Sequence, residues 1–171
     1  MSLEEDGADN VRRMLTLRLT QKLARRLRVK LPPEVQPATH PCADWCCHVF
    51  TVARHRYFLV THATTYFSVI LRAKGATNPS DFVTTVTAGL RMYLADAGHT
   101  FAYERFIAPE LAAVAFSPVG NRQITGVMND FARVASFFLT DLSPFETSDR
   151  LNEVPVSPLG GKSPVDLFPP G

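Results

Sequence analysis

The sequence is poor in cysteine and has no long apolar run. Its three cysteines are an odd number, and the acidic residues Glu4, Glu5 and Asp6 stand where a secretory signal would be basic and then apolar. We therefore do not expect a disulfide framework. The longest apolar runs, such as 111–116, fall far short of the ~18–20 residues that a membrane-spanning helix needs. These absences predict a cytoplasmic protein without a membrane segment.

The common catalytic motifs are also missing. The chain has no G-x-S-x-G nucleophile elbow, no H-E-x-x-H zinc motif, no phosphate-binding P-loop and no dinucleotide fingerprint. Each of these motifs places a nucleophile, a metal or a phosphate in a defined geometry, so their absence removes the enzyme classes that depend on them. We expect neither a bound metal nor a cofactor.

Charge is unevenly spread along the chain. The net charge of +2 combines four acidic residues within 1–10, eight basic and no acidic residues within 11–30, eight basic against seven acidic residues within 31–140, and five acidic against two basic residues within 141–171. A length of 171 residues with 46% hydrophobic residues suits one globular domain. We predict a mobile leader at 1–13, one folded domain at 14–140 and a proline-rich tail at 141–171.

Local patterns predict both strands and helices. Period-two alternation and short apolar runs bounded by turn residues indicate strands, whereas capping residues followed by apolar positions at helical spacing indicate helices. The predicted strands cover 14–19, 47–52, 57–61, 66–71 and 111–116, and the predicted helices cover 21–29, 80–97 and 122–140. The short connections between the second, third and fourth strands predict a three-strand antiparallel meander.

These elements predict an α+β fold. We expect a mostly antiparallel sheet packed by two longer helices and one short basic helix. The tail holds six of the 13 prolines, which is compatible with a disordered end or with an extended strap over the domain. Because it also contains several apolar residues, we predict that it docks in part.

The longest predicted helix has a polar stripe opposite its apolar face. Arg122, Gly126, Asn129 and Arg133 fall within about 40° of each other on a helical wheel, with Asp130 at the edge. Glycine inside a helix costs about 0.5–1 kcal/mol relative to alanine, so Gly126 predicts that a ligand or a loop approaches the backbone. The other interpretation is a solvated face, or one that anchors nearby loops.

Three short stretches carry a family resemblance. They are N-R-x-x-x-G-x-M-N-D-F at 121–131, L-x-L-T-Q-K-L-A at 17–24 and N-x-x-P-V-x-P-L at 152–159, together with Trp45. The chain resembles a family of small uncharacterised bacterial domains. The resemblance implies a domain of unknown function, with Trp45, Arg122, Gly126, Asn129 and Asp130 as its signature positions.

The cysteines lie close to two histidines. His40, Cys42, Cys46, Cys47 and His48 offer five possible zinc ligands within nine residues. However, neighbouring Cys46 and Cys47 point to opposite faces of a strand, and no second knuckle follows. We therefore expect no zinc site, with one of these thiols buried and the other exposed.

The basic segment and the polar stripe lead to two functional hypotheses. Our leading one is a non-catalytic binding module that contacts a protein partner or a nucleic acid, with Lys22, Arg25, Arg26 and Arg28 as possible phosphate contacts. The alternative is a small hydrolase or phosphate-handling enzyme that uses Arg122, Asn129 and Asp130 with a histidine. Its candidate histidines are His48, His55, His62 and His99.

Overall fold

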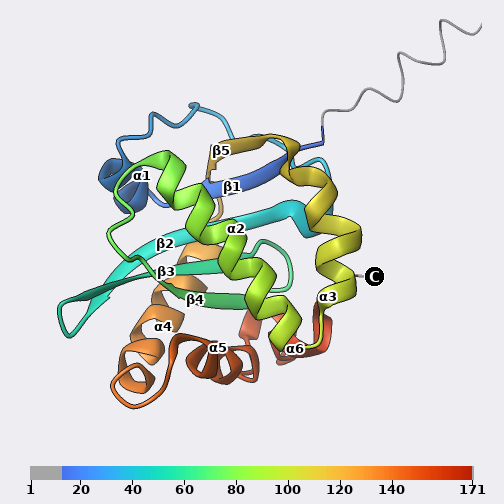
Figure 1. Ribbon diagram of the computed structural model, residues 1–171. Coiled ribbons are helices and arrows are strands. Elements are labelled where there is room, and N and C mark those ends of the chain that lie inside the picture. The colour runs from blue at the N-terminus through green and yellow to red at the C-terminus, as the bar shows by residue number, and fades with distance from the viewer. Residues whose placement is uncertain (1–12, 171) are drawn as a thin grey trace, which may run out of the picture.

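The computed structural model describes residues 13–170 (Figure 1). Its strands are β1 (Leu15–Leu19), β2 (Asp44–Val52), β3 (His55–His62), β4 (Ser68–Arg72) and β5 (Val114–Pro118). Its helices are α1 (Gln21–Leu27), α2 (Pro79–Asp96), α3 (Thr100–Ala102), α4 (Arg122–Phe138), α5 (Pro144–Asn152) and α6 (Pro164–Leu167). Single-turn elements lie at Pro41–Ala43, Tyr103–Ile107, Ala108–Ala112 and Ser157–Leu159. The fold is α+β. The predicted leader at 1–13 falls almost entirely outside the described residues.

The five strands form one mixed sheet in the order β4-β3-β2-β1-β5. Strands β2, β3 and β4 form the expected antiparallel meander. Strand β1, however, is parallel to both β2 and β5, so the prediction of a mostly antiparallel sheet was wrong. After β1 the chain passes through α1 and a proline-rich loop, which returns it to the starting edge. Such a crossover produces parallel pairing, and local periodicity does not reveal it.

The helices begin at capping side chains. The hydroxyl of Thr20 accepts from the Leu23 amide at 3.4 Å, and the Asn78 side chain accepts from the Asp81 amide at 2.9 Å. Asn121 caps α4 in the same way. These bonds satisfy amide groups that the first helical turn leaves without partners. The predicted strand at 111–116 is corrected: Pro109 stands at the start of a 3₁₀ turn, and pairing begins only at Val114.

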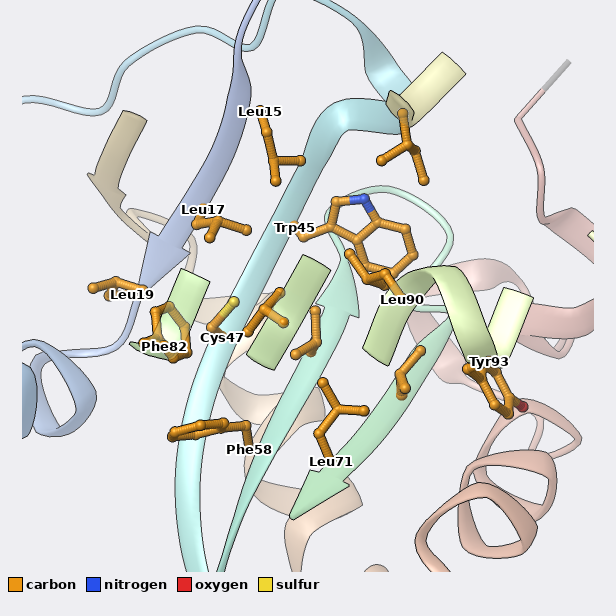
Figure 2. Close-up of a cluster of buried hydrophobic side chains, with 14 of the residues drawn as sticks. Leu15, Leu17, Leu19, Trp45, Cys47, Phe58, Leu71, Phe82, Leu90 and Tyr93 are labelled. Carbon is orange, nitrogen blue, oxygen red and sulfur yellow. The ribbon is translucent and has the colours of Figure 1, made fainter. Parts of the chain in front are cut away.

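Each face of the sheet carries its own core. Helix α2 covers one face, where Trp45, Phe58, Leu71 and Leu90 pack together (Figure 2). Helix α4 covers the meander on the other face, where a second cluster includes Ile70 and, from α5, Leu151. The sheet is thus the middle layer of three, and both faces of its central strands are buried.

A buried ion pair lies on the second of these faces, where β1 lies between β2 and β5. The Arg18 guanidinium donates to both oxygens of Asp44, at 2.7 and 3.1 Å, and to the hydroxyl of Ser117 at 3.1 Å. The Arg18 and Asp44 side chains are only 8% and 16% exposed. Because the charge of Arg18 is fully paired here, we assign this residue to the fold rather than to a binding surface.

The C-terminal segment packs on the domain. Helix α5 lies along the outer edge of β4 (Figure 1), where Asn152 and Ser148 bond to its backbone. Further on, the ring of Phe168 stacks on Phe67 with a centroid distance of 4.5 Å and contacts Trp45. Residues beyond 141 therefore contribute side chains to the core.

Candidate binding surfaces

The basic residues predicted to bind phosphate lie at one end of the sheet. Because β1 and β2 are parallel, their carboxyl ends lie at the same edge, where β1 leads into α1 and β2 turns back into β3. Helix α1 and the β2–β3 hairpin project from this end (Figure 1). We define the basic surface as Lys22, Arg25, Arg26 and Arg28 of the α1 region with Arg54 and Arg56 of the hairpin. All six side chains are exposed except that of Arg26, which is partly buried.

Like charges influence one another within the basic surface. Burial and the positive charge of Arg56 lower the pKa of Arg26. The Arg26 Nε is buried and has no hydrogen-bond partner among residues 13–170. The ion pairs found in that range join Arg18 to Asp44 and Arg133 to Asp130, and neither includes a residue of the basic surface. The surface is therefore not neutralised by the described part of the chain.

A strained turn holds Arg54 at the hairpin tip. Ala53 and Arg54 have φ values of 48° and 69°, a left-handed conformation that two-residue hairpins ordinarily give to asparagine and glycine. The two hairpin arginines were missed as candidates. The signal that finds them is the strand register, which pairs Arg56 with Thr51 and sets it on the same face as buried Phe58, toward α1.

The predicted polar stripe on α4 faces outward. Arg122, Gly126, Asn129 and Arg133 are all exposed, and Asp130 bonds Arg133 at 2.8 Å. A Cβ built on Gly126 meets nothing within 4 Å, so no loop among the described residues approaches this glycine. The C-terminal segment lies on β4 and does not cover the stripe.

Trp45 is a core residue and lies apart from that stripe. It is fully buried on β2, donates from Nε1 to the carbonyl of Cys42 at 2.8 Å and meets the edge of the His62 ring. His62 is equally buried. Its Nε2 donates to the Pro41 carbonyl at 2.7 Å, which leaves Nδ1 to accept from Thr65. This bonding requires a neutral imidazole, so we assign His62 to the structure of the core.

We expect stability to fall in mild acid. Burial lowers the pKa of His48, His62 and His99 from an ordinary value of 6.5. The folded protein therefore binds fewer protons than the unfolded chain once the pH drops below that value. The free energy of unfolding, measured in urea between pH 8 and pH 5 with wild-type protein, should be constant above about pH 6.5 and decline below it. A constant or rising free energy over the acidic half of this range would contradict the assignment.

All three thiols are buried. Cys46 and Cys47 point to opposite faces as expected, but each is fully covered by its own core, so the expectation of an exposed thiol was wrong. Burial raises the pKa of Cys42 to about 11 and that of Cys46 to about 12. Such groups are weak nucleophiles at neutral pH. Within residues 13–170 no group of three or more histidine, cysteine or acidic side chains is placed to hold a metal ion.

Three pockets open on other parts of the described surface. A groove of about 460 Å³ runs between α2, β4 and the start of α5, and two smaller pockets of about 260 and 360 Å³ share Asp149 and Glu153. None of these three is lined by a residue of the α4 stripe. The described helices include none that is long and apolar enough to cross a membrane.

A protein-family model matches most of the chain. The family model described as "Domain of unknown function (DUF6933)" matches residues 16–167. No curated protein and no solved structure shows a significant match to the chain. The matched range begins within β1 and ends within α6, so it includes the C-terminal segment as well as the sheet.

Proposed function

The chain belongs to the family described as a domain of unknown function (DUF6933), and from its surface chemistry we propose that it is a non-catalytic binding module whose basic surface contacts the phosphate backbone of a nucleic acid. The observation that carries this proposal is that six cations from two different elements gather at one end of the sheet (Figure 1) and form no ion pair with an acidic residue among residues 13–170. Like charges repel, so placing them together is unfavourable unless an anion binds between them.

Two features favour a ligand that carries many phosphates over a single small anion. The basic surface extends over a helix and a hairpin, so its guanidinium groups are distributed and do not converge on one pocket; none of the three pockets above is lined by its residues. A nucleic acid presents phosphates at regular intervals along its backbone, and arginines bind them one by one without a deep site.

Binding to a short fluorescent DNA duplex should be steeply salt-dependent. In the variant Arg25→Ala/Arg26→Ala, the slope of log K against log salt between about 50 and about 200 mM should flatten by about 1 per phosphate contact removed, with weaker affinity throughout. The measurement is fluorescence anisotropy. Arg25 is exposed and Arg26 is partly buried, so the double variant removes a charge from each of these two parts of the basic surface.

A matched control removes the same charge elsewhere. Arg91 of α2 and Arg105 are both exposed and lie outside the basic surface. The variant Arg91→Ala/Arg105→Ala should keep the wild-type slope. Equal weakening of both double variants would show that only net charge matters, and an absence of salt-sensitive binding in the wild type would refute the proposal.

The alternative of a small hydrolase has less support. Its proposed groups Arg122, Asn129 and Asp130 are exposed, and the carboxylate of Asp130 is bonded to Arg133. His62, one of its candidate histidines, is held in the core on β3. No observation brings a reacting group to the α4 stripe, so this alternative stays a sequence-based prediction.

A further inference from the structure

The edge strand β4 is only partly capped. Asn152 of α5 accepts from the Ser68 amide at 2.7 Å and donates to the Ser68 carbonyl at 2.9 Å, and the Ser148 hydroxyl accepts from the Ile70 amide at 2.7 Å. These side chains make the bonds that a sixth strand would make. Helix α5 thus protects the first half of the edge, as natural sheets commonly do.

Beyond the Ile70 amide this cap ends. Antiparallel pairing with β3 directs alternate residues of β4 outward, and the bonds of Ser68 and Ile70 show that theirs is the outward set. The Ile70 carbonyl and the amide and carbonyl of Arg72 therefore point away from β3. Among residues 13–170 none of these three groups has a hydrogen-bond partner. Because Ile70 is fully buried, its carbonyl is not accessible, and the amide and carbonyl of Arg72 form the short open stretch of edge.

This open stretch borders the groove of about 460 Å³, whose lining residues come from β4, α2 and the start of α5. Its lining includes Leu71, Ala88, Met92 and Phe145, and the Met92 side chain is 63% exposed. Helix α2 approaches β4 closely at Gly89, where an added Cβ would lie 2.3 Å from a Leu71 methyl. Free backbone groups and apolar walls thus occur side by side, as in sites that bind an extended peptide.

The charges at the rim of the groove indicate which kind of peptide it binds. The groove is lined by two cations, Arg72 and Lys74, both exposed, and by no carboxylate. From these observations we infer that the groove binds an extended acidic segment of a partner protein, which pairs with the end of β4 at Arg72 as an added strand. One face of that segment inserts an apolar side chain between α2 and Phe145, and its acidic residues meet Arg72 and Lys74. This site is separate from the proposed nucleic-acid contact.

The test uses the full chain and a library of short peptides in which acidic and apolar residues alternate. We expect selected peptides to bind in fluorescence anisotropy and to protect the Arg72 amide from hydrogen exchange. N-methylation of the peptide amide that pairs with the Arg72 carbonyl should weaken binding about fivefold or more. Exchanging the acidic residues for lysine should weaken it further at low salt.

Two tryptophan variants on α2 test whether the peptide binds in the groove. Ala88 lines the groove and Ala95 does not, and both are exposed. Ala88→Trp should fill the groove and weaken peptide binding about tenfold or more, whereas Ala95→Trp should leave it unchanged. Failure of every library peptide to bind, or equal binding by both variants, would overturn the inference.

Other occupants would give different results. If a second copy of the chain covered the groove, the wild type would dimerise with rising concentration and Ala88→Trp would remain monomeric. If the rim belonged to the nucleic-acid surface, a DNA duplex would displace the peptide. Either outcome would overturn the inference. Peptide binding that persists in the presence of DNA supports it, and it does so even if the basic surface binds no DNA.

Discussion

Replacing Asp44 with alanine is expected to lower the free energy of unfolding by about 3–5 kcal/mol, because it leaves the buried Arg18 guanidinium without its counter-ion. Arg18 is 7% exposed as a residue and makes both of its carboxylate bonds to Asp44. The hydroxyl of Ser117 remains as its partner but carries no charge. Urea denaturation followed by circular dichroism measures the change.

Two further variants show whether the loss of stability comes from an unpaired buried charge or from a general loss of packing. Asp130→Ala removes an ion pair of the same length, 2.8 Å against 2.7 Å, but its side chains are 66–72% exposed. It should change stability by less than about 0.5 kcal/mol. The double variant Arg18→Met/Asp44→Leu removes both buried charges and should recover much of the stability lost in Asp44→Ala. Equal losses for Asp44→Ala and Asp130→Ala would contradict this explanation.

Phe168→Ala should cost about 3–5 kcal/mol, although only three residues of the sequence follow it. Its ring is 4% exposed and meets four aromatic rings: those of Trp45, His62, Phe67 and His99. Trp45 is the single tryptophan of the chain. Its emission should therefore shift to longer wavelength as the cavity left by Phe168 admits water.

Val165 provides the matched control. It lies three residues earlier on α6 and is 45% exposed. Val165→Ala should change the free energy of unfolding by less than about 1 kcal/mol and leave the tryptophan emission in place. If Phe168→Ala behaved like Val165→Ala, the C-terminal segment would be an attachment and not a part of the core.

Local signals in the sequence identified most of the elements. Thr20, Asn78 and Asn121 each begin a helix as expected, because capping depends on residues within one turn. The meander was also predictable, since short connections leave little choice but antiparallel pairing. The pairing of β1 with β5 was not, because about 95 residues separate the two strands and no local pattern specifies which strands become neighbours.

The candidate sites were less predictable for a related reason. The arginines of α1 are visible in the sequence, but Arg56 joins them only through the strand register. Asn152 and Ser148 look like ordinary tail residues, and their bonds to β4 depend on where α5 docks. The polar stripe on α4 was recognised from helical periodicity, yet periodicity shows only that residues share a face and not what that face meets.

The position of β1 also has a consequence for synthesis of the chain. This strand is made before β2 and β5 but lies between them in the sheet, and β5 ends only at Pro118. Until the ribosome has released that segment, one edge of β1 has no neighbour, and Arg18 lacks its bond to Ser117. A nascent chain that ends shortly before β5 thus exposes an unpaired parallel edge, which is a site for association with other chains. Productive folding of the N-terminal strand is therefore a late event during translation.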